Sequence, residues 1–272
     1  MSRQVRFPSS EYMQDFTSQM CANAPTPSGT DYFPIGILTD KRDNKTYEVR
    51  KFADGNCWMT TNLAYGGADL RSDGLDGCLK TTYCGHGYNT DGSCVLPSHG
   101  VSTGASTVDV IAPGLYGDCR YPYDDIAAAD INKYGYLYNW QAAVQDPSAY
   151  YMNVYQPPLP LEGLCPDGWY LPTGAGTGQF QALSDAANSP SAAFWQPGGS
   201  WNGVYAGYTD QLNNERLIEQ GATGRYWSSI AASDSWAPNS AYIFWVDSQG
   251  LLYLGRSIGK YRGLAIRCLK TP

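Results

Sequence analysis

The sequence predicts an α+β domain that its last strand closes. Two cysteines in aromatic-rich contexts, Cys165 and Cys268, bracket the C-terminal third of the chain of 272 residues. Short segments of strand character occur together with one clear helical pattern, and turn-forming residues separate them. We therefore expect the chain's end to return as a strand and to be fixed to the middle of the fold.

The N-terminal part follows from local patterns. Residues 1–30 are polar and rich in turn formers, which predicts a linker with one short helix over residues 10–20. Residues 35–38 and 46–52 have strand character. The polar cluster at residues 40–45 between them predicts a turn, so these two strands are expected to form a hairpin.

Two later segments predict helices. Residues 131–144 begin with polar side chains and end in Trp-Gln-Ala-Ala-Val, which predicts a strand that passes into a short helix. Residues 179–187 have apolar side chains at helical spacing. In that helix, Phe180, Leu183 and Ala187 are expected to face the core.

Residues 31–272 are expected to form one domain with a long insertion. Within residues 66–120 the composition shifts to Gly, Ser, Thr and Asp, and little apolar periodicity remains. A segment of this kind needs covalent staples to hold a shape. It holds four of the chain's eight cysteines, which are Cys78, Cys84, Cys94 and Cys119.

The composition indicates an exported protein. Eight cysteines, an even number, occur with 22 Tyr, 30 Gly and only 16% charged residues, which suits disulfide-bonded extracellular proteins. The net charge of −7 argues against nucleic acids and anionic membranes as partners, because no basic patch exists to neutralise phosphate groups. No apolar stretch reaches the roughly 18 residues of a membrane helix. Because no targeting segment is visible either, we expect that an export signal or an N-terminal anchor has been removed.

Catalytic and metal-binding motifs are weak. Both histidines, His86 and His99, lie in the insertion, so the aromatic-rich blocks have no nearby histidine base for a Ser or Cys nucleophile. The cysteine spacings of the insertion favour disulfides over a zinc site, because no compact Cys-x-x-Cys pair is present. The glycines of residues 174–178 favour a flexible helix entry over a phosphate-binding turn. An acidic cluster favours a solvated loop over a glycosidase carboxylate pair, with a structural calcium left open, at Asp124, Asp125 and Asp130.

Five aromatic-rich blocks carry a resemblance to a known family. They are residues 55–63, 134–140, 165–172, 226–229 and 261–268. In this order they resemble the Fibrobacter succinogenes major paralogous domain, a bacterial surface module grouped with C-type-lectin-like folds. The resemblance implies small twisted antiparallel sheets, two or more helices, long loops and, here, a disulfide-rich insertion.

The resemblance also implies two disulfides. Met-Gln-Asp at residues 13–15, followed by Cys21, matches an upstream segment of such family members, which implies a bridge from Cys21 to Cys57. The closing strand implies a second bridge, from Cys165 to Cys268. The insertion's four cysteines then allow three pairings, among which the sequence does not choose.

Activities of related folds are not carried over. Formylglycine-generating enzymes share a related fold and use a reactive cysteine pair near the C-terminus, whereas only Cys268 lies there in this chain. The calcium and sugar signatures of true C-type lectins are absent. No cofactor is therefore expected.

Residues 241–247 give the clearest strand pattern. Every residue but the last is apolar or aromatic, so alternation alone does not decide which face is buried. The pattern in relatives implies that Tyr242, Phe244 and Val246 point inward and that Ile243, Trp245 and Asp247 point outward. An exposed Ile and Trp form an apolar patch of the kind that marks interaction sites. The alternative is that a second layer, such as the insertion, covers them.

Residues 226–268 are similar to the variable segment in target proteins of diversity-generating retroelements, in which a lectin-like scaffold holds side chains that are rewritten by mutagenesis at adenines. The similarity implies a fixed scaffold at Tyr226, Trp227, Ser228, Ser229, Ala241, Tyr242, Phe244, Val246, Tyr261, Gly263, Ile266, Arg267 and Cys268. It implies changeable, ligand-binding positions at Ile230, Ala232, Asp234, Ile243, Trp245, Asp247, Leu251, Tyr253, Arg256, Ile258, Arg262 and Leu264.

We therefore expect a non-catalytic, adhesin-like domain on a bacterial cell surface that binds a protein or glycan on another cell. The alternatives are a secreted enzyme that acts on polysaccharide and a structural surface-layer or pilus component. The large aromatics of the scaffold blocks are expected to be buried, namely Trp58, Trp140, Trp169 and Trp227. The final strands are expected to expose one common face that holds Ile243, Trp245, Leu251, Tyr253 and Arg256.

Overall fold

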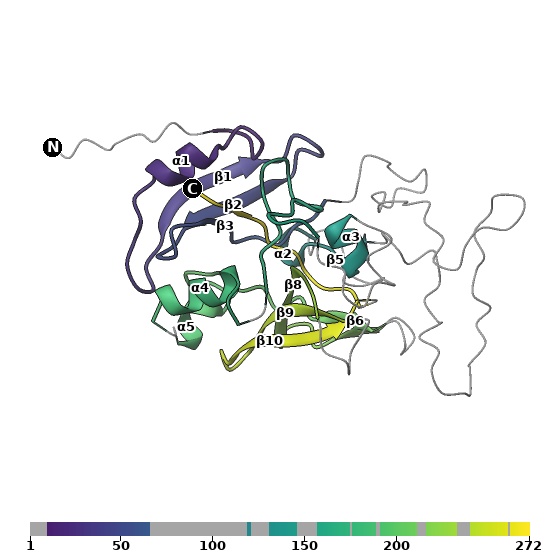
Figure 1. Ribbon diagram of the computed structural model, residues 1–272. Coiled ribbons are helices and arrows are strands. Elements are labelled where there is room, and N and C mark those ends of the chain that lie inside the picture. Colours follow the sequence, from purple (N-terminus) through teal and green to yellow (C-terminus); the bar gives the residue numbers. More distant parts are fainter. Residues whose placement is uncertain are drawn as a thin grey trace, which may run out of the picture.

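The protein combines helices with several small antiparallel sheets, so the α+β class is confirmed; the computed structural model is drawn in Figure 1. The structure describes residues 10–65, 119–120, 131–145, 157–174, 176–188, 191–210, 216–232, 240–260 and 262–272. In these ranges, no helix has the length and apolar character needed to cross a membrane.

The first sheet holds the N-terminal hairpin and the last strand. Its strands β1 (Phe33–Thr39), β2 (Thr46–Lys51), β3 (Cys57–Met59) and β11 (Leu269–Lys270) pair antiparallel in that order. The N–H of Asp40 donates to the carbonyl of Lys45 at 2.7 Å and closes the predicted turn between β1 and β2. Because β11 pairs with β3, the last strand closes the sheet, as the sequence predicted.

Two disulfides join distant parts of the chain to this sheet. Cys21–Cys57 joins α1 (Ser18–Asn23) to β3, with Cα atoms 5.9 Å apart. Cys165–Cys268 fixes the residue just before β11 to the middle of the chain, with Cα atoms 5.8 Å apart. These are the two pairs that the family resemblance implied. The C-terminus accordingly lies beside α1 and β1 (Figure 1).

The N-terminal helix is shorter than predicted. It begins at Ser18 rather than at residue 10, and the hydroxyl of Thr17 accepts a hydrogen bond from the N–H of Met20 at 3.2 Å. The backbone before this cap is used elsewhere, because the N–H of Met13 donates to the carbonyl of Thr39 at 2.9 Å. Because the backbone before Thr17 pairs with the end of β1, it does not form part of the helix.

The second sheet is a meander of β8 (Thr223–Ala231), β9 (Ser240–Asp247) and β10 (Leu252–Gly259), with β9 in the centre. Two smaller sheets pair β4 (Cys119–Arg120) with β5 (Leu137–Tyr138) and β6 (Tyr208–Asp210) with β7 (Arg216–Ile218). The remaining helices are α2 (Ile131–Tyr134), α3 (Trp140–Val144), α4 (Gln179–Ala186) and α5 (Ala192–Trp195). The strand and helix predicted over residues 131–144 are thus preceded by one further helical turn.

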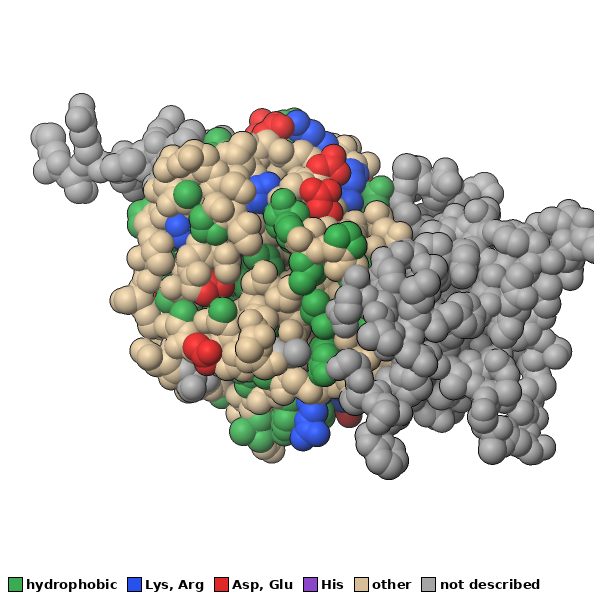
Figure 2. Space-filling view, viewed as in Figure 1, with side chains coloured by type: hydrophobic (Ala, Val, Ile, Leu, Met, Phe, Trp, Pro, Cys, Tyr) green, Lys and Arg blue, Asp and Glu red, His purple; other side chains and the backbone are tan. Residues whose placement is uncertain are grey.

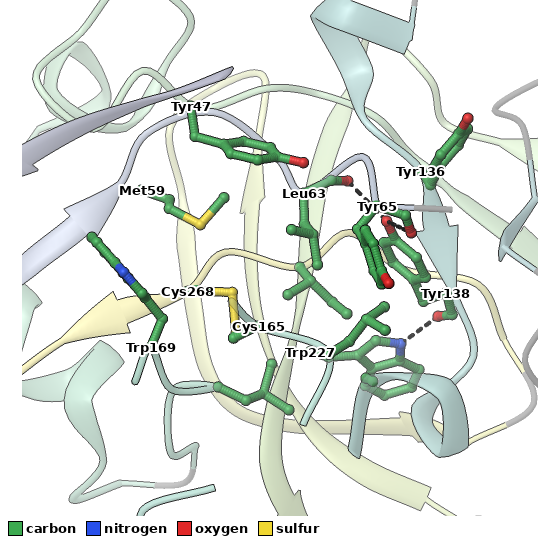
Figure 3. Packing of buried hydrophobic residues seen from close by; sticks show 14 of the residues in the cluster. Tyr47, Met59, Leu63, Tyr65, Tyr136, Tyr138, Cys165, Trp169, Trp227 and Cys268 are labelled. Atoms are coloured by element: carbon green, nitrogen blue, oxygen red, sulfur yellow. Dashed lines mark hydrogen bonds between the residues drawn. A yellow bond between two sulfur atoms is a disulfide. The ribbon is translucent and has the colours of Figure 1, made fainter. Parts of the chain in front are cut away.

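Both faces of the central strand β9 are packed. Ile243 belongs to one buried cluster, which surrounds Cys165 and Cys268 and is drawn in Figure 3. Phe244 belongs to a second cluster, where its ring stacks on that of Phe180 with centroids 4.6 Å apart. The predicted core positions of α4 and the segment after it, Phe180, Leu183 and Ala187, are buried in this second cluster. The predicted burial of Trp58, Trp140, Trp169 and Trp227 is confirmed.

A buried cation organises the loops around the C-terminal segment. Arg267 lies between the rings of Trp201 and Tyr226, with its guanidinium carbon 4.8 and 5.0 Å from their centroids. Its Nε donates to the side-chain oxygen of Asn62 at 2.9 Å and its Nη1 to the carbonyl of Trp201 at 2.7 Å. Burial lowers its pKa. Because a buried charge needs such partners, Arg267 fixes two loops against the last strand.

Several expectations concern residues outside the described part of the chain. These are Cys78, Cys84, Cys94, His86, His99, Asp124, Asp125 and Asp130. For Cys119, in β4, the backbone alone is described. The pairing within the insertion and the calcium expectation therefore stay predictions.

Candidate binding face

One face of the three-stranded sheet brings together four of the twelve side chains predicted to bind a ligand, Ile243, Trp245, Tyr253 and Arg256. Residues that are paired across antiparallel strands point to the same side of a sheet. One such row holds Arg225 of β8, Trp245 of β9 and Tyr253 of β10. The next row holds Trp227, Ile243 and Arg256.

The row of Trp227 and Ile243 lies under other parts of the chain. The indole Nε1 of Trp227 donates to the carbonyl of Tyr138 in β5 at 2.6 Å, as drawn in Figure 3. The indole Nε1 of Trp140 in α3 donates to the carbonyl of Ser228 in β8 at 2.7 Å. Ile243 is consequently only 3% exposed. We call Trp227 and Ile243, with β5 and α3 against them, the covered half of the face; Arg256, at the β10 end of this row, is exposed and is counted with the open half.

The prediction that Ile243 is exposed is therefore wrong. Its side of the strand was predicted correctly, because it shares that side with Trp245, but a second layer lies there. That layer includes β5 and α3. On the opposite side, Phe244 and Val246 are buried as predicted, whereas Tyr242 is half-buried. A central strand with both faces packed has no solvent side at this row.

The other row forms a continuous stack. The rings of Trp245 and Tyr253 stack with centroids 4.4 Å apart and planes 26° apart. The guanidinium carbon of Arg225 lies 4.3 Å from the ring centroid of Trp245 and 3.9 Å from that of Tyr208 in β6. We call the set Tyr208, Arg225, Trp245 and Tyr253 the arginine–aromatic stack, and the part of the face that holds it the open half. Tyr208 and Arg225 are buried, whereas Trp245 and Tyr253 are half-buried.

Glu219 orients the arginine of the stack. Its Oε2 accepts hydrogen bonds from Nη2 of Arg225 at 2.5 Å and from the hydroxyl of Thr223 at 3.0 Å. The backbone of Glu219 has a φ of 59°, a left-handed conformation that residues other than glycine seldom adopt. Such strained residues concentrate at functional sites. The ion pair holds the guanidinium near the rings of Tyr208 and Trp245, so Arg225 is positioned without a ligand.

Two donors within the stack find no acceptor among the described residues, and they are the buried Nε of Arg225 and Nε1 of Trp245. A buried donor left unpaired costs about 1–3 kcal/mol. A hydrogen-bond acceptor on a bound molecule that reached either group would remove this cost.

The tip of the β9–β10 hairpin presents an apolar side chain beside the stack. Leu251 is 52% exposed, and Arg256 further along β10 is exposed as well. Oδ1 of Asp247, which is half-buried, accepts hydrogen bonds from the N–H groups of Gln249 and Leu251, both at 2.9 Å. Asp247 thereby shapes the turn that presents Leu251.

The remaining predicted positions are scattered. Ala232 and Leu264 are fully buried, so their prediction as ligand contacts is wrong. The N–H of Ala232 donates to the carbonyl of Ser240 at 2.9 Å, and Leu264 exchanges backbone hydrogen bonds with Tyr138 at 2.8 and 2.9 Å, which places both residues inside the sheet layers. Half-buried positions are Ile230, Ile258 and Arg262, and Asp234 lies outside the described residues.

The sequence analysis missed three residues of this site. Arg225 had a detectable pattern, because it stands two positions before Trp227 in a strand and period-two geometry puts both on one face. Tyr208 and Glu219 had none, since their separate strand and turn meet the stack only in the folded chain. The arrangement therefore depends on tertiary contacts that no local pattern encodes.

Within the described residues, no group of three or more His, Cys, Asp or Glu side chains could hold a metal ion. Burial lowers the pKa of Lys260, which follows β10 and lies 4.7 Å from the ring centroid of Trp140, to about 8. Figure 2 shows one side of the described surface, where charged side chains are few and hydrophobic ones form a band.

No protein-family model, curated protein or solved structure matches this chain. The assignment of a function therefore rests on the sequence resemblance and on the geometry of the open half.

Proposed function

We propose that this chain is a non-catalytic ligand-binding domain of a bacterial cell surface, and that its ligand contacts the open half of the β8–β10 face. The observation that carries the proposal is the arginine–aromatic stack, whose half-buried end adjoins the exposed Leu251 and Arg256. Trp, Tyr and Arg are the residues that most often dominate binding energy at interfaces.

The rigidity of the stack supports this role. When binding immobilises flexible side chains, the binding free energy is weakened by about 0.5–1.5 kcal/mol for each one. Here the ring of Trp245 is already held between Arg225 and Tyr253, and Glu219 fixes Arg225. Binding to such a surface needs little reordering, so affinity depends mainly on the fit of the ligand.

The resemblance to C-type-lectin-like surface modules favours an extracellular location. The two disulfides within the described residues are consistent with that location. The ligand is a protein or a glycan on another cell. We extend the proposal to retroelement diversification of the exposed positions Leu251 and Arg256 and of the half-buried ones, among which Trp245 and Ile258 also pack against the first core cluster. A reverse transcriptase gene beside a near-copy of the 3′ end of the coding sequence is the expected genomic finding, and its absence contradicts this extension alone.

The binding proposal is tested with the oxidised chain on arrays of bacterial cells, surface proteins and glycans. Replacing Tyr253 and Arg256 by Ala removes the outer ring of the stack and its charged neighbour, and we expect binding to weaken at least about tenfold, which corresponds to about 1.4 kcal/mol. The melting temperature is expected to fall by only a few degrees, since an aromatic pair contributes about 0.5–1.5 kcal/mol.

The matched control is Ile37→Ser on β1. Ile37 is 70% exposed and belongs to the other sheet, so this change alters an equally apolar surface away from the stack. Unchanged binding by the Tyr253→Ala, Arg256→Ala variant, or equal loss in the control, contradicts the proposed face. Release of new reducing ends from a polysaccharide on the array points instead to the enzyme alternative.

A further inference from the structure

A hollow opens between the linker after α1 and the loop after α5, and none of its lining residues belongs to β8, β9 or β10. It measures about 340 Å³, within the range of about 300–1,000 Å³ in which small-molecule sites fall. Figure 1 shows the connection from α1 to β1 passing down toward α4 and α5. The residues that line the hollow are Pro25, Pro27, Asp31, Tyr32, Phe33 and Ser200.

One arginine joins the two walls of this hollow. The guanidinium carbon of Arg50 lies 4.2 Å from the ring centroid of Tyr32, and its Nη1 donates to the carbonyls of Gly199 and Ser200 at 3.0 and 2.6 Å. Its Nε and Nη2 donate to the carboxylate of Glu48. Arg50 therefore holds Tyr32 and the opposite loop at a fixed distance.

The linker wall is anchored at its start. Nζ of Lys51 donates to the carbonyls of Cys21 and Ala24 at 2.7 and 2.9 Å, so the chain enters Pro25 in a defined direction. The N–H of Asp31 donates to the carbonyl of Ser28 at 3.2 Å and forms a turn before Tyr32. The sequence predicted a plain linker here, whereas the structure places it as an ordered wall.

The lining offers rings and acceptors. Tyr32 is 40% exposed, and proline rings form the neighbouring apolar surface. Within the described part of the chain, the side-chain oxygens of Asp31, Tyr32 and Ser200 make no hydrogen bond, so they face the hollow or solvent unpaired. Prolines contribute no N–H donor. A ligand for this lining needs an apolar face for the rings and several donors for the oxygens.

The lining offers no unpaired cation to an anionic ligand. The guanidinium of Arg50 is already engaged by the carboxylate of Glu48 and by the ring of Tyr32. Asp31 is the charged side chain among the lining residues, and its carboxylate repels an anion. A neutral molecule with C–H faces and many hydroxyl groups fits the rings and the oxygens of this lining.

We propose that this hollow is a binding site for a neutral saccharide, separate from the β8–β10 face. One sugar ring lies on Tyr32 with its C–H groups, and its hydroxyls donate to the carboxylate of Asp31 and exchange hydrogen bonds with Ser200. Because the hollow is open to solvent and buries little of a ligand, we expect weak, millimolar affinity. The site stands whether or not the open half of the sheet binds a ligand.

Saturation-transfer NMR on the oxidised chain tests the site with a panel of glucose, galactose, mannose, N-acetylglucosamine and their common disaccharides. We expect transfer to at least one of these sugars. Tyr32→Ala is expected to weaken binding at least about tenfold, and Tyr32→Trp, which keeps a ring, is expected to restore it. Asp31→Ala is expected to weaken binding, whereas Ile37→Ser, outside the lining, leaves it unchanged.

Three results overturn the proposal. One is the absence of transfer to every sugar of the panel at 10-fold to 100-fold molar excess. Another is undiminished transfer with Tyr32→Ala. The third is loss of transfer with Tyr253→Ala but not with Tyr32→Ala, which moves the sugar to the β8–β10 face and leaves the proposed function standing.

Discussion

The covered and open halves of one sheet face differ although they lie two residues apart. Ile243 and Trp245 are on the same side of β9, yet Ile243 is 3% exposed and Trp245 is half-buried in a stack that reaches solvent. The difference comes from the layer above, because β5 and α3 bond to β8 at Trp227 and Ser228, beside Ile243. Strand alternation assigns a side, and the neighbouring elements decide whether that side is core or surface.

The largest expected effect concerns the support beneath the covered half. Cys268 belongs to the same buried cluster as Ile243, and its bridge to Cys165 closes a loop with a sequence separation of 103. Replacing both cysteines by Ala is expected to lower the free energy of unfolding by up to about 4–5 kcal/mol in the chain-entropy model. Urea unfolding of the two proteins measures this, and mass spectrometry of the parent chain checks that neither thiol is free. A loss below about 1 kcal/mol contradicts it.

The comparison itself is tested by truncating one apolar side chain on each half. Ile243→Ala leaves a cavity between packed layers and is expected to cost about 2–5 kcal/mol. Leu251→Ala, at the exposed hairpin tip, is expected to change the free energy of unfolding by no more than about 0.5 kcal/mol. Both are measured by urea unfolding. Equal losses in the free energy of unfolding at the two positions show that the two halves are packed alike, which contradicts the distinction between a covered and an open half.

The same contrast, between local sequence patterns and cover by distant elements, explains which parts of the structure the sequence predicts. The hairpin at residues 33–51, the α4 core positions and the buried scaffold tryptophans have local patterns, and these predictions are confirmed. The start of α1 and the burial of Ile243 were predicted wrongly, because pairing with Thr39 and cover by β5 come from distant parts of the chain. The arrangement of Arg225, Tyr208 and Glu219 depends on several strands meeting, which no window of sequence contains.

The pH dependence of stability tests the burial of Lys260 at the covered half. Lys260, whose backbone carbonyl accepts the N–H of Trp140 at the covered half, has a pKa lowered by burial to about 8, against about 10.4 in an unfolded chain. Between these values the unfolded state binds more protons, so the free energy of unfolding is expected to rise as the pH rises from 8 to 10. Burial lowers the pKa of Lys51 and Lys270 too, which adds to the rise.

Lys260→Met removes the Lys260 part of this pH dependence and is the matched control. Urea unfolding at pH 8, 9 and 10 measures the slope for both proteins. Above about pH 10, Tyr138 and Tyr226, whose pKa values are raised by burial, stay protonated in the folded chain and lose their protons in the unfolded chain. The free energy of unfolding is therefore expected to fall as the pH rises further. Identical slopes for the two proteins below pH 10 contradict the assignment to Lys260.

The smallest expected effect concerns the open half alone. Glu219→Gln keeps the shape of the side chain and removes the charge that Nη2 of Arg225 contacts at 2.5 Å. Because the Glu219 side chain is 38% exposed, solvent screens the pair, and we expect a loss of about 0.2–1 kcal/mol in the free energy of unfolding.

Acrylamide quenching of tryptophan fluorescence measures the order of the stack. In Glu219→Gln the stack is expected to lose order more than the fold loses stability, so the indole of Trp245 becomes more accessible to acrylamide. Comparison with Trp245→Phe isolates the fluorescence of Trp245. Thr223→Val, which removes the other donor to Glu219, serves as the control with a neutral partner. Unchanged quenching with Glu219→Gln means that the rings hold Arg225 without the carboxylate, and the stack is then ordered by packing alone.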